Sequence, residues 1–214
     1  MKIFLDTADF EEIVAADKTG LIDGVTTNPT LIRKSGRDPF EVYQDIKELG
    51  INDISMEVAG DYDQMLAQSI ELHYKFGDCC TVKLPMTVEG LQVCQVLSKQ
   101  SIRTNVTLIF NAAQALLAAK SGATYISPFV GRVDDQGYAG TEVVRSCAEL
   151  LRPFKTQVLA ASIRTTQRVV RSFYNGADIV TMPPKVFWSM YKSVLTDQGL
   201  DIFNSDIIEI QQRH

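Results

Sequence analysis

Short segments rich in β-branched and other apolar residues alternate with longer helical segments along the whole chain. The strand-like segments are 2–6, 24–28, 54–58, 80–84, 103–109, 125–130, 157–162 and 178–182. The helical patterns between them include 39–49, 62–76, 88–99, 111–122, 141–154 and 165–176. Thr87 and Asn111 are suitable N-caps, and Gly122 and Gly176 are suitable C-terminal stops. This alternation predicts βα units and a parallel sheet.

Eight strands with a helical segment in each interval favour a closed (β/α)₈ barrel, the TIM-barrel architecture of the α/β class. An open, doubly wound sheet is the main alternative, but that fold usually carries a glycine-rich loop after its first strand. Here that position reads DTADFEE, at 6–12, without a glycine. The length of 214 residues is short for two domains, so we expect a single barrel domain over 1–214.

Two helical segments, 184–193 and 200–212, follow the last predicted strand, which is one more than a barrel requires. We therefore expect a C-terminal helical extension over 196–214. Its apolar residues are Leu200, Ile202, Phe203, Ile207, Ile208 and Ile210. These side chains could cover the chain's own barrel or contact another copy of the chain, and the sequence leaves both alternatives open.

The charge and hydropathy patterns exclude two kinds of partner. A net charge of −5 without runs of basic residues argues against nucleic acid. No apolar run approaches the roughly 18 residues of a membrane span, so no membrane partner is expected. The N-terminal segment is interrupted by Asp6 and therefore has no signal-peptide core.

The cysteines and histidines predict neither a metal nor a cofactor. The four cysteines are Cys79, Cys80, Cys94 and Cys147. Their spacing matches no zinc pattern, and His73 and His214 add no ligand cluster. We expect free thiols in a reducing cytoplasm, with the adjacent Cys79 and Cys80 buried in a strand context.

The alternation of side chains within each strand predicts a polar rim inside the barrel. The outer face packs on helices and is apolar, and the inner face carries the other alternating residues. In 80–84, for example, Val82 and Leu84 suit the helix side, so Lys83 points inward. The inward residues near the C-terminal strand ends are Asp6, Thr26, Asn28, Glu57, Lys83, Asn105, Thr107, Ser127 and Phe129. Branched apolar side chains normally fill barrels, so this polar set indicates a functional site.

Lys83 carries the clearest chemical consequence. Lysine is rarely buried unless paired, so a purely structural ion pair with Glu57 is one alternative. The other is catalytic, because burial favours a neutral amine that attacks a ketone and forms an imine, or Schiff base. A protonated imine withdraws electrons and permits cleavage of a nearby carbon–carbon bond without a metal. The surrounding hydroxyls and amides favour the catalytic alternative.

Such a reaction also needs groups that move protons and hold the substrate. We expect Glu57, with a water held by Thr107, to serve the carbinolamine step. We expect Asp6 to take the proton of the C4 hydroxyl during cleavage. Asn28 and Asn105 are expected to hold the hydroxyls of a three-carbon dihydroxyacetone unit.

A phosphate site is predicted at the same end of the barrel. Arg132 follows the sixth strand, Ser162 ends the seventh, and Arg164 follows it. Loops after the later strands often bind phosphate in barrels, and arginine makes bidentate contacts with oxyanions. Each arginine alone is better explained by a surface ion pair, but the two arginines and Ser162 at the same end of the barrel favour a phosphate site.

Several segments carry a resemblance to a known family. They are FLDTAD at 4–9, GVTTNPTLI at 24–32, VKLPMTVEGL at 82–91, TNVTLIFNAAQALLAAKSGATYISPFVGRVDD at 104–135, and LAASIR at 159–164. With them the chain resembles the small-subunit transaldolase and fructose-6-phosphate aldolase family over nearly its whole length. The resemblance implies a barrel of circularly permuted strand order with Lys83 as the Schiff-base lysine. The residues it implies around the substrate are Asp6, Asn28, Glu57, Thr107, Ser127, Arg132, Ser162 and Arg164.

The resemblance also implies a setting for the protein. It implies a cytoplasmic enzyme of the non-oxidative pentose phosphate pathway that acts on sugar phosphates. It implies a homo-oligomer, a pentamer or decamer, in which the C-terminal helix reaches a neighbouring subunit. No cofactor is implied.

Two positions distinguish the branches of this family. Members that act as aldolases carry Tyr where this chain has Phe129 and Gln where it has Glu57, so both positions resemble the transaldolase branch. A phenol helps protonate the enamine and release free dihydroxyacetone, whereas an apolar ring leaves the enamine to an aldehyde acceptor. The expected donors are sedoheptulose 7-phosphate and fructose 6-phosphate, and the acceptors glyceraldehyde 3-phosphate and erythrose 4-phosphate. A fructose-6-phosphate aldolase and a non-catalytic sugar-phosphate-binding barrel are the alternatives.

Overall fold

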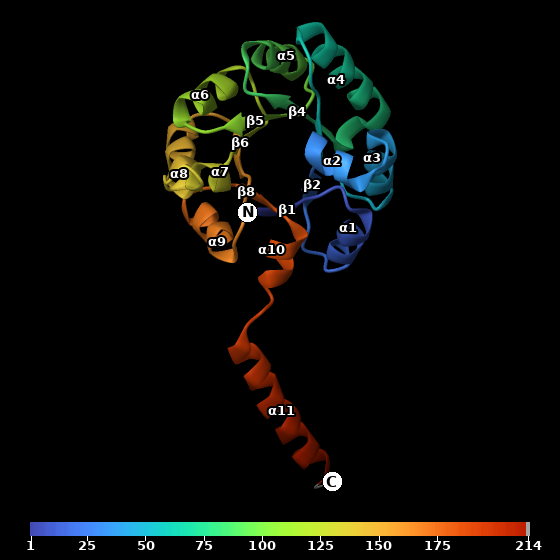
Figure 1. Ribbon diagram of the computed structural model, residues 1–214, viewed down its shortest axis with the longest axis vertical. Helices are drawn as coiled ribbons and strands as arrows, with labels where there is room; N and C mark the ends of the chain where they lie inside the picture. Colours follow the sequence, from blue (N-terminus) through green and yellow to red (C-terminus); the bar gives the residue numbers. More distant parts are fainter. Residues whose placement is uncertain (213–214) are drawn as a thin grey trace.

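A computed structural model describes residues 1–212, and its eight parallel strands close into a barrel surrounded by helices (Figure 1). The strands are β1 (Lys2–Asp6), β2 (Gly24–Thr26), β3 (Ile54–Glu57), β4 (Cys80–Pro85), β5 (Thr104–Ile109), β6 (Tyr125–Pro128), β7 (Gln157–Ala160) and β8 (Ile179–Met182). Neighbours in the barrel follow chain order, and β1 closes it by pairing with both β2 and β8. The predicted TIM barrel is confirmed.

Helices fill the intervals between the strands and form the outer ring of Figure 1. They are α1 (Phe10–Asp17), α2 (Pro29–Ser35), α3 (Pro39–Glu48), α4 (Tyr62–Phe76), α5 (Val88–Lys99), α6 (Ala112–Lys120), α7 (Val130–Asp134), α8 (Gly140–Leu151), α9 (Thr166–Tyr174), α10 (Pro184–Ser189) and α11 (Val194–Gln212), with a 3₁₀ turn, η1 (Gly77–Cys79). The predicted N-caps are confirmed, since Thr87 accepts from the Gly90 amide and Asn111 from the Gln114 amide. Gly122 and Gly176 end their helices with φ of 89° and 90°.

Two short helices, α2 and α7, are not predicted by the sequence patterns. The segment 24–28 predicts a longer strand, but β2 ends at Thr26 because the Asn28 side chain caps α2 by accepting from the Leu31 amide at 3.0 Å. Likewise β6 ends at Pro128, because Phe129 is the residue that precedes α7. Both helices follow strand ends on the rim where the polar residues gather, so they place loop residues over the barrel opening.

Apolar clusters lie on both sides of the barrel wall. The larger cluster joins outward side chains such as Val25, Met56 and Leu84 to the helices, as the alternation predicts. The smaller cluster lies inside and contains Phe4, Tyr125, Leu159, Ala161 and Ile179, with Phe129 packed against it. The buried polar residues Ser55, Thr81 and Asn105 come instead from β3, β4 and β5. The barrel interior therefore combines an apolar cluster from β1, β6, β7 and β8 with buried polar side chains from β3, β4 and β5.

The pairing of β5 with β6 is irregular between Val106 and Ile109. Within this bulge Leu108 adopts a left-handed backbone with φ of 61°, which is unusual for a residue other than glycine. Alternation along 103–109 would place Leu108 outward with Val106, yet Leu108 belongs to neither apolar cluster. Simple alternation fails here because the bulge inserts an extra residue into the strand.

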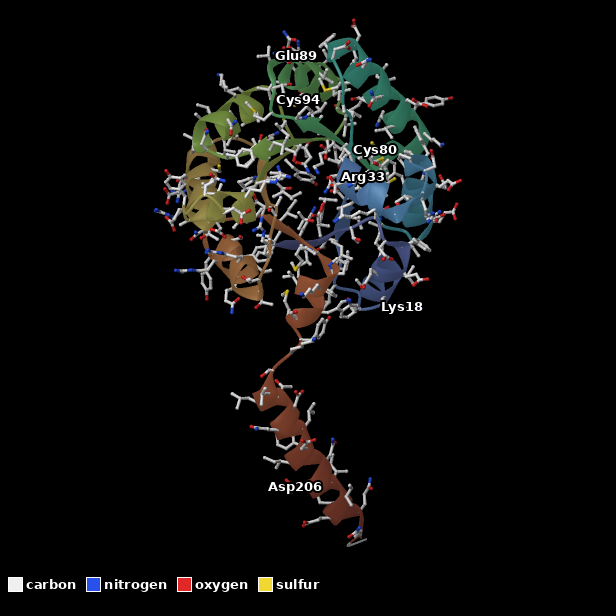
Figure 2. All side chains as sticks on the ribbon, in the orientation of Figure 1. Lys18, Arg33, Cys80, Glu89, Cys94 and Asp206 are labelled. Carbon is white, nitrogen blue, oxygen red and sulfur yellow. The ribbon has the colours of Figure 1, made fainter. Side chains whose placement is uncertain are left out.

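The helix α11 leaves the barrel and extends away from it, as the lower part of Figure 1 shows. None of its residues is buried, and Asp206 lies far from the barrel (Figure 2). The alternative that this helix covers its own barrel is therefore wrong. The helix starts slightly before the predicted boundary at 196, and positions 213–214 of the expected extension lie outside the described residues. No helix in the range 1–212 is long and apolar enough to cross a membrane.

All four cysteines are free and buried, as expected. Cys80 and Cys94, labelled in Figure 2, lie inside the body of the barrel domain. Burial raises the pKa of Cys80 to about 12, so this thiol stays protonated and unreactive at neutral pH.

Candidate active site

A cavity of about 130 Å³ opens at the C-terminal ends of the strands. Its walls are formed by Asp6, Thr26, Asn28, Lys83, Asn105, Ser127, Phe129, Arg132, Leu159, Ala161, Ser162 and Thr181. All the predicted site residues except Glu57, Thr107 and Arg164 line it. The inward face read from the sequence therefore converges on one small, mostly polar space at the end of the barrel where active sites form.

Lys83 projects from the middle of β4 into this cavity and is only 5% exposed. Its Nζ lies 2.9 Å from Glu57 Oε2 and donates to the Thr27 carbonyl oxygen at 2.8 Å. Glu57 stands directly beside Lys83 in the β3–β4 register, so backbone pairing holds the two side chains together. This distance is short enough for a proton to pass directly between the amine and the carboxylate.

Besides its contact with Lys83, Glu57 also borders a second pocket. Its side chain is 17% exposed and lines a separate pocket of about 480 Å³, whose wall is formed by α2, α3 and α4 residues such as Ile32, Tyr43 and Leu72. The carboxylate thus lies between the buried amine and a path to solvent. This position suits a group that exchanges protons with water as well as with Lys83.

Asp6, at the end of β1, accepts a hydrogen bond from Thr26 Oγ1 at 2.8 Å. Burial raises the pKa of Asp6, and the charge of Lys83 and the Thr26 hydrogen bond oppose that rise. Thr26 Oγ1 also lies 2.7 Å from Thr181 Oγ1 on β8. The carboxyl group therefore holds its proton more readily than one in water, as a group that moves protons near neutral pH must.

A second chain of hydrogen bonds crosses β3, β5 and β6. Asn105 Nδ2 donates to Ser55 Oγ at 3.1 Å, and Ser127 Oγ donates to Asn105 Oδ1 at 2.7 Å. All three side chains are buried. Because both ends of the Asn105 amide are engaged, its orientation on the cavity wall is fixed.

Thr107 lies two residues beyond Asn105 on β5 and is buried. Its Oγ1 has no hydrogen-bond partner among the described residues, which is uncommon for a buried hydroxyl. The bulge at Leu108 follows immediately. A strained strand end next to an unpaired hydroxyl is typical of a position shaped for a bound molecule.

The side of the cavity at α7 combines an aromatic ring with an arginine. The Arg132 guanidinium lies 5.0 Å from the Phe129 ring centroid, and Phe110 packs edge-on against the same ring at 5.8 Å. These contacts hold the Arg132 side chain at the cavity mouth. Arg132 is otherwise exposed, so its guanidinium is accessible to an anion.

The predicted partner of Arg132 in phosphate binding has a different environment. Arg164 forms a two-pronged ion pair with Asp135, and both side chains are about half exposed. It does not line the cavity. Gly131 brings the two loops together, since an added Cβ would lie 2.4 Å from the Ser162 carbonyl oxygen and 2.7 Å from Arg164 Nε.

Some residues of the cavity wall are missed by the sequence reasoning. Thr181, Leu159 and Ala161 line the cavity, and the Thr27 carbonyl oxygen accepts from Lys83. The alternation in 178–182 places Thr181 on the same face as the inward Ile179, so that signal is present in the sequence. A backbone carbonyl leaves no trace in side-chain patterns.

The described residues contain no group of three or more His, Cys, Asp or Glu side chains placed to hold a metal ion. The chemistry of the site comes from the Lys83 amine, the Asp6 carboxyl group and several hydroxyl and amide groups on the cavity wall, together with the Glu57 carboxylate that is paired with Lys83. A lysine inside a (β/α)₈ barrel, paired with a carboxylate at the active end, defines the class of Schiff-base barrel enzymes.

Comparison with known proteins identifies the family. The sequence model described as "Transaldolase/Fructose-6-phosphate aldolase" matches residues 3–213. A "probable transaldolase" of Bartonella bacilliformis is 45% identical over 216 residues, covering 100% of this chain and 99% of the relative. Similar proteins of the same name from Paracoccus denitrificans and Clostridium botulinum are 45% and 47% identical, over 100% and 96% of this chain and 99% and 96% of the relatives. The chain belongs to the transaldolase/fructose-6-phosphate aldolase family.

Proposed function

We propose that this protein is a transaldolase that transfers a dihydroxyacetone unit between sugar phosphates through a Schiff base on Lys83. The observation that carries the proposal is the buried Lys83 amine held 2.9 Å from Glu57 at the active end of the barrel. Membership of the family and the names of the full-length relatives support the same activity.

The first half of the reaction builds the imine. Glu57 accepts a proton from the Lys83 ammonium, and the neutral amine attacks the C2 carbonyl carbon of the donor ketose. One proton of the attacking nitrogen passes to the former carbonyl oxygen to give the carbinolamine. Glu57 then returns its proton to the carbinolamine hydroxyl, which leaves as water and gives the protonated imine. The unpaired Thr107 hydroxyl is suited to hold that water, in keeping with its burial beside the site.

The second half breaks and remakes a carbon–carbon bond. Asp6 takes the proton of the C4 hydroxyl, the C3–C4 bond breaks, and its electron pair flows into the protonated imine to form an enamine. The aldehyde product departs, and an acceptor aldehyde takes the three-carbon unit as Asp6 returns its proton. Burial favours the protonated form of Asp6, which assists this return. Asn28 and Asn105 bind the hydroxyls of the retained unit.

A phosphate grip at the α7 side completes the substrate site. Arg132 and Ser162 line the cavity on the side away from β3, and we assign them to the phosphate of the substrate. Arg164 joins them through its guanidinium, whose ion pair with Asp135 is exposed and open to rearrangement. Arginine suits this role because its planar guanidinium makes paired contacts with phosphate oxygens.

Phe129 favours transfer over simple release. Its ring is packed between Phe110 and Arg132 on the cavity wall and offers no proton to the enamine. The enamine therefore waits for an aldehyde acceptor. A phenol at this position would supply an acid, as expected for the aldolase branch of the family.

We further propose that the protein works as a cytoplasmic homo-oligomer, a pentamer or decamer. The exposed apolar side chains of α11 include Leu200, Phe203 and Ile207, which a lone chain leaves in water. Patches of this kind mark protein–protein contacts. Another copy of the chain is the partner that covers α11.

The test is a paired assay with fructose 6-phosphate as donor, with and without erythrose 4-phosphate. A transaldolase consumes the donor rapidly only when the acceptor is present, and releases glyceraldehyde 3-phosphate and sedoheptulose 7-phosphate. Release of free dihydroxyacetone at a comparable rate without acceptor would contradict the proposal in favour of the aldolase.

A further inference from the structure

The hydroxyl of Thr181 is placed to act on Asp6 through Thr26. Thr181 comes from β8 and Thr26 from β2, the two strands that flank β1 in the closed barrel. Both side chains are only 2% exposed, and their Oγ1 atoms lie 2.7 Å apart. Thr26 Oγ1 then donates to Asp6 Oδ1 at 2.8 Å. The three polar groups form one buried chain across the barrel.

The number of available protons decides which hydroxyl donates in each of these hydrogen bonds. A hydroxyl carries a single proton, and Thr26 uses its own on the Asp6 carboxylate. Thr181 must therefore donate to Thr26 whenever Asp6 is ionised. A hydroxyl that accepts a hydrogen bond becomes a stronger donor, so the Thr181 bond strengthens the Thr26 contact with the carboxylate.

We propose that Thr181 is a positioning residue that keeps Asp6 oriented and ionised for removal of the C4 hydroxyl proton. This inference rests on the proposed transaldolase function. Asp6 needs the support, because burial raises its pKa and the nearby Glu57 carboxylate acts in the same direction. The opposing groups are the Lys83 ammonium and the Thr26 hydroxyl, and the Arg132 guanidinium lies on the same cavity wall.

The test compares Thr181→Val, which keeps the shape and removes the hydroxyl, with Thr181→Ser, which keeps the hydroxyl. We expect Thr181→Val to lower kcat about 2- to 10-fold, the range for one lost hydrogen bond. It should also move the acid limb of the kcat/KM profile upward by roughly 0.3 to 1 pH unit, because a less stabilised carboxylate binds its proton more tightly. Thr181→Ser should retain the wild-type limb.

A third measurement separates this inference from the proposed function. Borohydride trapping of the Lys83 adduct with fructose 6-phosphate should be equal in all three proteins, because imine formation does not use Asp6. An unmoved acid limb in Thr181→Val, or equal losses in both variants, would overturn the positioning role alone. A wild-type protein with neither adduct nor turnover would overturn the proposed function and this inference with it.

Discussion

The barrel and α11 depart from the usual pattern of apolar side chains inside and polar side chains outside, and they do so in opposite ways. The barrel buries polar groups, among them Lys83 and Asn105, where apolar side chains normally lie. The helix α11 exposes Phe203 and Ile207, which normally lie inside. Burial of polar groups costs free energy unless they are paired, and the barrel pairs most of them into hydrogen-bonded chains. This difference is the basis for assigning the proposed chemistry to the barrel and the proposed subunit contact to α11.

The largest effect is expected from removing Lys83, the proposed nucleophile of the barrel. Lys83→Met should lower transaldolase activity by at least about 10³-fold, because no other amine lies in the cavity wall. The barrel should still fold, since Glu57 keeps contact with solvent through its pocket. Steady-state rates and circular dichroism measure the two effects.

The matched control is Lys99→Met, which removes an exposed lysine from α5. Its activity should equal that of the wild type. Substantial turnover by Lys83→Met would show that the buried amine is not the nucleophile.

The next largest effect is expected at Asp6. Asp6→Asn should lower kcat about 10²-fold, because it removes the carboxylate that we propose as the base for the C4 hydroxyl proton. Activity of the wild type should fall as the pH drops through the raised pKa of this group, since only the ionised form is a base.

Stability should respond in the opposite sense. The folded state holds the Asp6 proton at pH values at which the unfolded chain has lost it, so stability falls as pH rises across that interval. Asp6→Asn should remove this fall, whereas Asp206→Asn on α11 should leave both activity and stability as they are. Chemical denaturation across pH checks the sign, and a more stable wild type at the upper end of the interval would contradict it.

We expect a smaller effect from replacing a glycine, and this effect should differ between Gly131 in the barrel and Gly199 in α11. Gly131→Ala forces a Cβ against the Ser162 carbonyl oxygen, so we expect about 1–3 kcal/mol of destabilisation and a higher KM for phosphorylated donors. Gly199→Ala on α11 meets nothing within 4 Å and should leave KM unchanged. Equal behaviour of the two variants would contradict the close packing assigned to the phosphate loops.

The smallest effect on the chemistry is expected from α11 itself. Phe203→Ser with Ile207→Ser, one helical turn apart, should shift the protein to smaller assemblies, because both side chains are exposed in the lone chain. Adduct formation at Lys83 should change less than about 2-fold, because surface changes far from a site have small effects. Sedimentation velocity measures the assembly, and an unaltered oligomer would contradict the role given to α11.

The sequence predicts the barrel and most of the cavity because period-two alternation is strong where polar and apolar residues share a strand. Lys83 between Val82 and Leu84 is the clearest case. The same rule fails at Leu108, since a bulge shifts the count by one residue. It misses α2 because the Asn28 amide, rather than an apolar pattern, starts that helix.

Contacts across the barrel are the part that local patterns cannot reach. The pairing of Arg164 with Asp135 joins loops distant in sequence, and so does the contact between Thr26 and Thr181. The sequence also does not predict what α11 packs against, for a related reason. The sequence of the helix shows which of its residues are apolar, but it does not show which surface they would contact.

The most direct test of Lys83 as the Schiff-base residue is borohydride reduction in the presence of fructose 6-phosphate, followed by peptide mass spectrometry. We expect a reduced dihydroxyacetone adduct on Lys83, present in the wild type and missing from Lys83→Met. An adduct on another lysine, or no adduct during measurable turnover, would contradict the central claim that the buried amine of β4 carries the transferred unit.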